Sequence, residues 1–118
     1  MREIVFYYTL SGRSPVRDFL DDLSPQQLKK VAKQLELVGE VEMIPSHLMK
    51  KLTGTDGLWE IRIQHTGNAF RILCFWDGAR IVVLVSAFAK KTTKTPALEI
   101  EVAQRRRREY LNRKERHG

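Results

Sequence analysis

Arginines and lysines gather around three apolar segments in the second part of the chain, and their types favour the binding of an anion. Arg62 lies in LWEIRIQ and Arg71 in AFRILCFW, while IVVLVSAF is followed by the acid-free run AKKTTKTP. Guanidinium groups bind phosphate through paired N–H donors, and a lysine among other cations has a lowered pKa that favours proton transfer near neutral pH. The lysines near these segments are Lys50, Lys51, Lys90, Lys91 and Lys94.

The net charge points to the same class of partner. The chain of 118 residues carries +7 at pH 7, and residues 1–49 hold six Lys/Arg against seven Asp/Glu, whereas residues 50–118 hold fifteen against seven. A one-sided excess of this kind indicates a site for nucleic acid or another polyanion. The three histidines have no metal-ligand spacing, and the sequence contains no Gly-rich phosphate loop and no nucleophile elbow.

Alternation along the apolar segments places both arginines on one face of a sheet. The turn HTGN makes Gln64 pair with Ala69, so that Arg62 faces Arg71 directly across two antiparallel strands. At about 5 Å the repulsion is roughly 1 kcal/mol in water and 3 kcal/mol at an effective dielectric near 20. An anion between the two groups would reverse the sign. Alternatively, the side chains splay apart, or Glu60 and Asp56 neutralise them.

The next hairpin extends this face. If Asp77-Gly78 is a two-residue turn, Trp76 pairs with Ala79 and Arg71 lies opposite Leu84. Phe88 then continues on the face of Arg71. The lysines after this strand emerge at the end of the sheet that displays the arginines.

The remaining signals predict an α+β fold, with a small antiparallel, mixed-edge sheet, two N-terminal helices on one face and a C-terminal helix. Residues 3–9 form a strand; Ser14-Pro15 and Ser24-Pro25 start helices, with Gln27 completing a capping box and Gly39 ending the second. That helix presents an apolar face of Leu28, Val31, Ala32, Leu35 and Val38, and Thr95-Pro96 caps the last helix.

The chain as a whole is expected to be one domain over residues 1–118, soluble and cytoplasmic. It has no signal-peptide pattern and no apolar run long enough for a membrane span, and its single cysteine fits a reducing compartment. Cys74 is expected in the core. The run Arg105 to Arg108 spans a full helical turn, so its four side chains cannot all face one ligand, and some should pack over the sheet.

Three segments together resemble the RelE/ParE toxin superfamily, in its phage-derived Gp49-like branch related to the HigB toxins. They are KKLTGTDGLWEIRI, FRILCFW and VLVSAFAKKTTKTP followed by a helix with EIEVAQRRRREYL. The resemblance covers roughly residues 1–112. It implies the toxin of a type II toxin–antitoxin pair, a ribosome-dependent mRNA endonuclease. Such enzymes need no metal or other cofactor: the ribose 2′-OH attacks the neighbouring phosphate and leaves a 2′,3′-cyclic phosphate and a 5′-OH.

The resemblance also implies roles for the basic residues. Arg62 and Arg71 match the strand arginines that bind the scissile phosphate, and Lys90 and Lys91 fall where relatives have a general acid or base. RNA-binding roles fall to Lys50, Lys51, Lys94 and Phe88. Relatives often carry Tyr or His where this chain has Phe88 and Ala89, so Phe88 could stack on a base but not move a proton. His65 is an alternative proton-transfer group.

The implied partners are mRNA on the ribosome and a helix-turn-helix antitoxin, with operator DNA bound only through the antitoxin and no membrane. Two other functions stay open. One is a relative that binds RNA or the ribosome without catalysis. The other is a ParE-type toxin that poisons DNA gyrase, an activity that does not require a phosphate-binding concavity.

Overall fold

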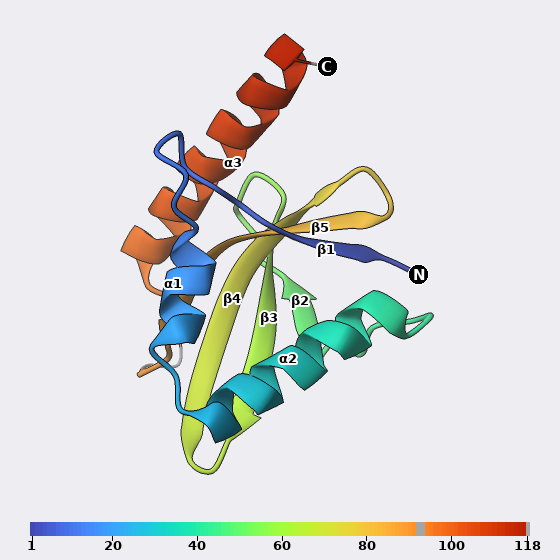
Figure 1. The fold of residues 1–118 in the computed structure, drawn as a ribbon. Helices are drawn as coiled ribbons and strands as arrows, with labels where there is room; N and C mark the ends of the chain where they lie inside the picture. Colours follow the sequence, from blue (N-terminus) through green and yellow to red (C-terminus); the bar gives the residue numbers. More distant parts are fainter. Residues whose placement is uncertain (92–93, 118) are drawn as a thin grey trace.

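The computed structural model describes residues 1–91 and 94–117, and over this range it has five strands in one sheet and three helices (Figure 1). The order of strands across the sheet is β1-β5-β4-β3-β2. The elements along the chain are β1 Glu3–Phe6, α1 Pro15–Asp21, α2 Pro25–Glu40, β2 Met49–Lys51, β3 Leu58–His65, β4 Asn68–Asp77, β5 Ile81–Ala89 and α3 Ala97–His117.

The sheet is mixed, as the sequence predicts. β1 runs parallel to β5, and the pairs β2–β3, β3–β4 and β4–β5 are antiparallel. The two N-terminal helices connect β1 to the rest of the sheet, which allows the parallel pairing at this edge. The α+β class and the mixed edge are confirmed.

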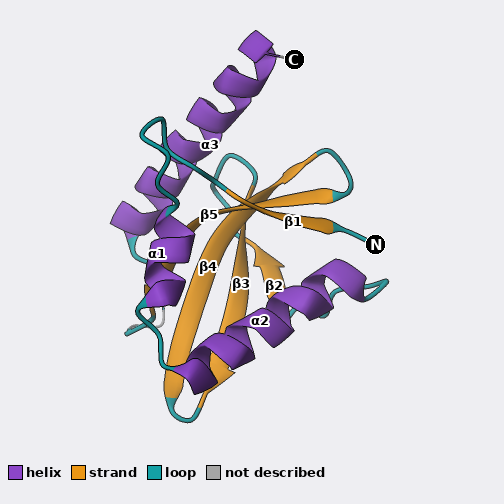
Figure 2. Ribbon diagram, viewed as in Figure 1, coloured by secondary structure: helices purple, strands orange, loops and turns teal. Residues whose placement is uncertain are grey.

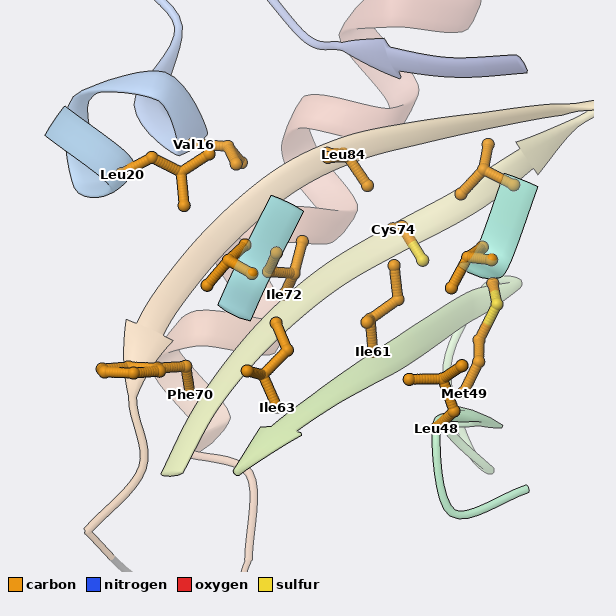
Figure 3. Packing of buried hydrophobic residues seen from close by; sticks show 13 residues of the cluster. Val16, Leu20, Leu48, Met49, Ile61, Ile63, Phe70, Ile72, Cys74 and Leu84 are labelled. Carbon is orange, nitrogen blue, oxygen red and sulfur yellow. The ribbon is translucent and has the colours of Figure 1, made fainter. Parts of the chain in front are cut away.

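Helices cover both faces of the sheet (Figure 2). α1 and α2 pack on the face that carries Ile61, Ile72 and Cys74, where the larger apolar cluster forms (Figure 3). α3 packs on the opposite face through Ala103, against a smaller cluster that includes Phe75. The placement of the two N-terminal helices on one face and the burial of Cys74 are confirmed.

The helix starts follow the predicted caps. The hydroxyls of Ser14 and Ser24 accept hydrogen bonds from backbone N–H groups in the first turns, and Gln27 completes the capping box. The predicted stop at Gly39 is wrong, because α2 continues to Glu40. Gly39 is buried, and a Cβ there would lie 3.3 Å from the carbonyl oxygen of Arg2. This glycine therefore permits close packing of α2 on the chain before β1.

The buried face of α2 is narrower than predicted. Val31 and Val38 are buried and Leu35 is half-buried, but Leu28 is 40% exposed and Ala32 is also exposed. The helix touches the sheet along the line of its three innermost apolar residues. The prediction that Leu28 and Ala32 face the core is wrong.

The turn between β4 and β5 also differs from its prediction. The strands pair up to Asp77 and Ile81, so residues 78–80 form a three-residue loop, and Trp76 pairs with Val82 rather than Ala79. Gly78 has a φ of +73°, which suits glycine in such a loop. A DG pair alone therefore did not determine the loop length.

A bulge changes the register further along this hairpin. The pairing skips Val85 beside Leu73, and Arg71 pairs with Phe88 instead of Leu84. The loop and the bulge together shift the register by four residues. Because this is an even number, Phe88 still lies on the face of Arg71, as predicted.

No helix within residues 1–91 and 94–117 is long and apolar enough to cross a membrane.

Candidate nucleic-acid interface

The two strand arginines lie opposite each other. In the β3–β4 hairpin Arg62 pairs with Arg71 and Gln64 with Ala69, so the predicted register is confirmed. Thr66 and Gly67 form the turn with φ values of +43° and +80°, which a tight two-residue hairpin turn requires. The turn therefore fixes the pairing that brings the two guanidinium groups together.

A buried carboxylate lies beside both guanidinium groups. Glu60 is 1% exposed, and its Oε1 lies 3.2 Å from Nε of Arg62 and 3.5 Å from Nε of Arg71. Its Oε2 accepts a hydrogen bond from the hydroxyl of Thr95. Glu60 therefore reduces the repulsion between the two arginines, which is one of the alternatives that the sequence left open. Asp56 makes no ion pair with either arginine in the part of the chain that the structure describes.

Glu60 leaves the outer part of Arg62 available. The Arg62 side chain is 35% exposed, and Glu60 binds only its Nε. Among the described residues, the two Nη groups of Arg62 have no hydrogen-bond partner. A guanidinium group held by Nε and open at both Nη atoms presents a fork that matches two phosphate oxygens.

Arg71 is more deeply placed. Its side chain is 11% exposed, its Nη1 donates to the carbonyl oxygen of Phe70 at 3.0 Å, and its Nε is buried without a hydrogen-bond partner among the described residues. Burial lowers the pKa of Arg71 and the neighbouring Arg62 adds to this, while Glu60 acts in the opposite direction. Arg71 supplies positive potential from beneath the surface rather than an open fork.

The basic pocket, defined here by Lys50, Lys51, Glu60, Arg62, Lys90, Lys94 and Thr95, has a volume of about 550 Å³. Leu52, Thr53 and Ile100 complete its lining. Of the lining residues that the structure describes, five are cationic and only Glu60 is acidic. A cavity with this balance concentrates anions.

Lys50 and Lys51 belong to a strand that the sequence did not reveal. They lie in β2, where Lys50 pairs with Glu60 and Lys51 with Trp59. The strand is three residues long, too short for an alternation pattern to be recognised. Pairing places Lys50 opposite Glu60, and both lysines line the basic pocket.

Lys90 enters the pocket from the end of β5. Its N–H donates to the carbonyl oxygen of Ala69 at 2.7 Å, which continues the β4–β5 pairing by one residue. Burial, and then the positive charges of Arg71 and Arg62, lower the pKa of Lys90, and Glu60 opposes them. The direction predicted for a lysine among cations is confirmed. Lys91 is exposed and does not line the pocket.

Two aromatic candidates lie away from the pocket. Phe88 is 8% exposed and packs in the cluster beneath α3, so its ring has little surface for a base. His65 ends β3, half-buried and outside the pocket lining. The structure therefore does not bring Phe88 or His65 together with the cations of the basic pocket.

The side chains of the run Arg105 to Arg108 do not all face the same way, as predicted. Arg106 donates through Nη1 to the Val85 carbonyl oxygen at 2.8 Å and to Ser86 Oγ at 2.9 Å. Arg107 lies 5.7 Å from the ring centroid of Phe75. Both side chains thus cover the sheet, while Arg105 and Arg108 are exposed.

Sequence reasoning missed the positioning role of Glu60 and Thr95. Alternation does place Glu60 on the face of Arg62, but neither its burial nor its contact with Thr95 follows from a local pattern. Thr95, predicted as a helix cap, donates its hydroxyl to Glu60, and the first backbone bond at the start of α3 runs from Ile100 to Pro96. In residues 1–91 and 94–117, no group of three or more His, Cys, Asp or Glu side chains is arranged to hold a metal ion.

Comparison with known proteins gives one family. Residues 18–108 match the family model described as phage derived protein Gp49-like (DUF891), a range that contains every residue of the basic pocket. No curated protein matches the chain by sequence.

Proposed function

This chain belongs to the family of phage-derived Gp49-like proteins, and we propose that it is the toxin of a type II toxin–antitoxin system that cleaves mRNA on the ribosome. The proposal joins this membership to the resemblance of KKLTGTDGLWEIRI, FRILCFW and VLVSAFAKKTTKTP to RelE- and HigB-like toxins. The observation that carries it is the basic pocket, in which the outer edge of Arg62 is open beside Lys90.

The chemistry requires stabilisation of a phosphorane-like transition state. The ribose 2′-oxygen forms a bond to phosphorus, the bond from phosphorus to the 5′-oxygen breaks, and negative charge grows on the non-bridging oxygens. Arg62 binds these oxygens through its two Nη groups, and Lys50 and Lys51 add positive potential. Because Glu60 and Thr95 hold the arginine and its carboxylate partner in place, little reorganisation is needed when the substrate binds.

Lys90 serves as the proton-transfer group of this mechanism. Its lowered pKa raises the fraction of neutral amine near pH 7, and that amine removes the 2′-OH proton. The 5′-oxygen leaves with a proton from a second pocket cation or from water. The products are a 2′,3′-cyclic phosphate and a 5′-OH. Lys91, which lies outside the pocket lining, has no part in this mechanism.

A second candidate function is RNA or ribosome binding without cleavage. The observation that favours it is Glu60 itself, which already neutralises part of the positive charge where a phosphate would bind. A gyrase-poisoning toxin has less support, because protein-mediated poisoning does not need a cationic pocket. For either kind of toxin we propose a helix-turn-helix antitoxin that covers the basic pocket and carries the pair to operator DNA.

The experiment that tests the proposal is cleavage by purified protein on ribosomes that hold a defined mRNA. We expect RNA cut in the A site, with 5′-OH and 2′,3′-cyclic phosphate ends, for the wild type and for Arg105→Ala, whose side chain is exposed. Arg62→Ala should cleave at least 100-fold more slowly, the loss typical of removing one transition-state donor. Ribosome binding without cleavage by the wild type would favour the second candidate instead.

A further inference from the structure

A second pocket lies next to the basic pocket, around the outer edge of β3. Its volume is about 300 Å³, and Arg62 lines both pockets. We call it the edge pocket and define it by Lys30, Gln34, His47, Arg62, Gln64 and Arg71.

The edge pocket exists because β2 is shorter than β3. The β2–β3 pairing ends at Met49 and Ile61, followed by a backbone bond from Arg62 N–H to the Leu48 carbonyl oxygen at 2.8 Å. β3 continues to His65, so its last residues have no strand beside them on this side. In Figure 1, α2 passes across this side of the sheet. The pocket thus connects the α2 side of the sheet with the face that carries the arginines.

α2 contributes two polar side chains to the pocket. Lys30 and Gln34 are one helical turn apart, both are half-buried, and both line the pocket. Their neighbours Lys29 and Lys33 are exposed and do not line it. The helix therefore has two classes of lysine, one directed to the pocket and one to solvent.

Four polar side chains of the pocket are unused within the fold, whereas Arg62 and Arg71 share Glu60 as an ion-pair partner. Among the residues that the structure describes, the side chains of Lys30, Gln34, His47 and Gln64 form no hydrogen bond or ion pair with one another or with other side chains. Arg71 contributes a buried Nε that has no hydrogen-bond partner among the described residues and lies 3.5 Å from the Glu60 carboxylate. His47 and Gln64 are exposed to solvent, but Lys30 and Gln34 are half-buried without a protein partner among the described residues. Polar groups withdrawn from solvent in this way favour a ligand that accepts hydrogen bonds.

The composition of the lining identifies the class of ligand. Its described residues include two arginines and a lysine but no carboxylate, and they include no Phe, Tyr or Trp on which a base could stack. Such a surface suits the phosphodiester backbone of a nucleic acid better than its bases. The shared Arg62 makes the two pockets a continuous cationic path.

We propose that the edge pocket binds the phosphodiester backbone next to the cleaved bond, so that one RNA strand runs from the basic pocket around the edge of β3 to α2. This inference rests on the proposed function. Lys30 supplies the charge contact, and Gln34, Gln64 and His47 supply hydrogen bonds to phosphate or ribose oxygens. The substrate is accordingly a single strand longer than the nucleotides that fill the basic pocket.

The test compares oligonucleotides of two lengths that cannot be cleaved, 2′-O-methyl RNA of three and of eight nucleotides, by fluorescence anisotropy over a range of salt concentrations. Lys30→Gln should weaken binding of the eight-nucleotide strand about 3- to 10-fold and reduce its salt dependence by about one phosphate contact, while leaving the three-nucleotide strand unchanged. Lys33→Gln, from the exposed side of the same helix, is the matched control and should change neither. His47→Ala should reproduce the length-dependent loss.

The outcomes separate this inference from the proposed function. If Arg62→Ala weakens both strands while Lys30→Gln and His47→Ala behave like Lys33→Gln, the edge pocket is not an RNA site although the basic pocket is one. If neither strand binds, or if Arg62→Ala binds both as the wild type does, the edge site is wrong, and cleavage on programmed ribosomes decides the proposed function separately.

Discussion

Glu60 and Arg62 lie two residues apart on β3, so both side chains extend from the same face of the sheet. The carboxylate binds one edge of the guanidinium group and leaves the other edge open. Removing one partner of a buried ion pair leaves the other charge uncompensated. Replacing Glu60 or either arginine therefore costs folding free energy. At the residue scale, Glu60 holds Arg62 in position. Its negative charge also raises the pKa of Lys90, against the lowering caused by burial and by the two arginines.

Replacement of Glu60 tests both of these roles. Lys90 has its pKa lowered by burial and by two arginines, and Glu60 acts against this, so Glu60→Gln should lower the pKa of Lys90 further. Because the neutral amine is the proposed base, the acid limb of the cleavage rate against pH should move to lower pH. The measurement is a pH–rate profile on programmed ribosomes.

Glu36→Gln, an exposed change on α2, serves as the control for Glu60→Gln and should leave the profile in place. A Glu60→Gln enzyme that is slower at every pH, with an unmoved limb, would remove Lys90 from its proposed role.

The sequence predicted part of this site for a clear reason. The register of Arg62 against Arg71 follows from a two-residue turn, and such a turn leaves little freedom. The position of Lys50 depends on a three-residue strand that pairs only because β3 offers it an edge. The contact between Thr95 and Glu60 joins segments 35 residues apart, and no local pattern encodes it.

At the element scale, α3 is held on the sheet by a carboxylate in the β4–β5 hairpin. Asp77 accepts hydrogen bonds from the hydroxyl of Tyr110 at 2.8 Å and from Nζ of Lys114 at 2.5 Å. These two bonds lower the pKa of Asp77, whereas burial opposes them. Burial, and then the bond to Asp77, raise the pKa of Tyr110 to about 12.

Asp77→Asn should destabilise the protein by about 1.5–3 kcal/mol at pH 7, the range for a hydrogen bond to a charged group. Lys114 is 57% exposed and adds little to this, so the bond from Tyr110 accounts for most of the loss. The folded pKa of Asp77 lies below its ordinary value of 3.8, so its stabilisation is complete above that value and is lost as the pH falls through the folded pKa.

Urea unfolding at several pH values measures this difference. The gap between wild type and Asp77→Asn should close on acidification, and Lys114→Met should show a smaller gap at pH 7. A gap that does not shrink at all as the pH falls below 3.8 would mean that the carboxylate charge is not the source of the stability.

The β5 bulge is also supported by α3. The carbonyl group of Val85 and the hydroxyl of Ser86 are buried, and both bond to Arg106 Nη1. Arg106→Met should leave these groups without that donor and cost about 1–3 kcal/mol. Thermal or urea unfolding gives the value, and the exposed Arg105→Met should stay within about 0.5 kcal/mol of wild type. Equal stabilities of the two variants would show that the bulge does not depend on Arg106.

The same bulge helps to explain why the register of the β3–β4 hairpin was predicted correctly and that of the β4–β5 hairpin was not. β3–β4 has a regular ladder from its turn onward, so local turn chemistry decides every pair. β4–β5 combines a three-residue loop with a skipped residue that bonds to a helix far along the chain. The predicted face of Phe88 was still correct, because the loop and the bulge together shift the register by an even number of residues.

At the scale of the whole molecule, cationic residues from both parts of the sequence line two adjoining pockets. The basic second part of the sequence supplies the basic pocket, and Lys30 from the nearly neutral first part reaches the adjoining edge pocket. RNA affinity should therefore fall steeply with salt, by about 0.7 logarithmic units per tenfold change in salt for each phosphate contact. Anisotropy titrations measure this slope, and a slope near zero would contradict an electrostatic interface.

Under the proposed function, the basic pocket around Arg62 cleaves mRNA during translation. The most direct test is inducible expression in a bacterium with mapping of mRNA 5′ ends, for the wild type, Arg62→Ala and Arg105→Ala. We expect growth arrest and new 5′-OH ends inside translated reading frames for the wild type and Arg105→Ala, and neither effect for Arg62→Ala. Arrest without new 5′ ends, or cleavage that survives in a folded Arg62→Ala protein, would contradict the proposed function.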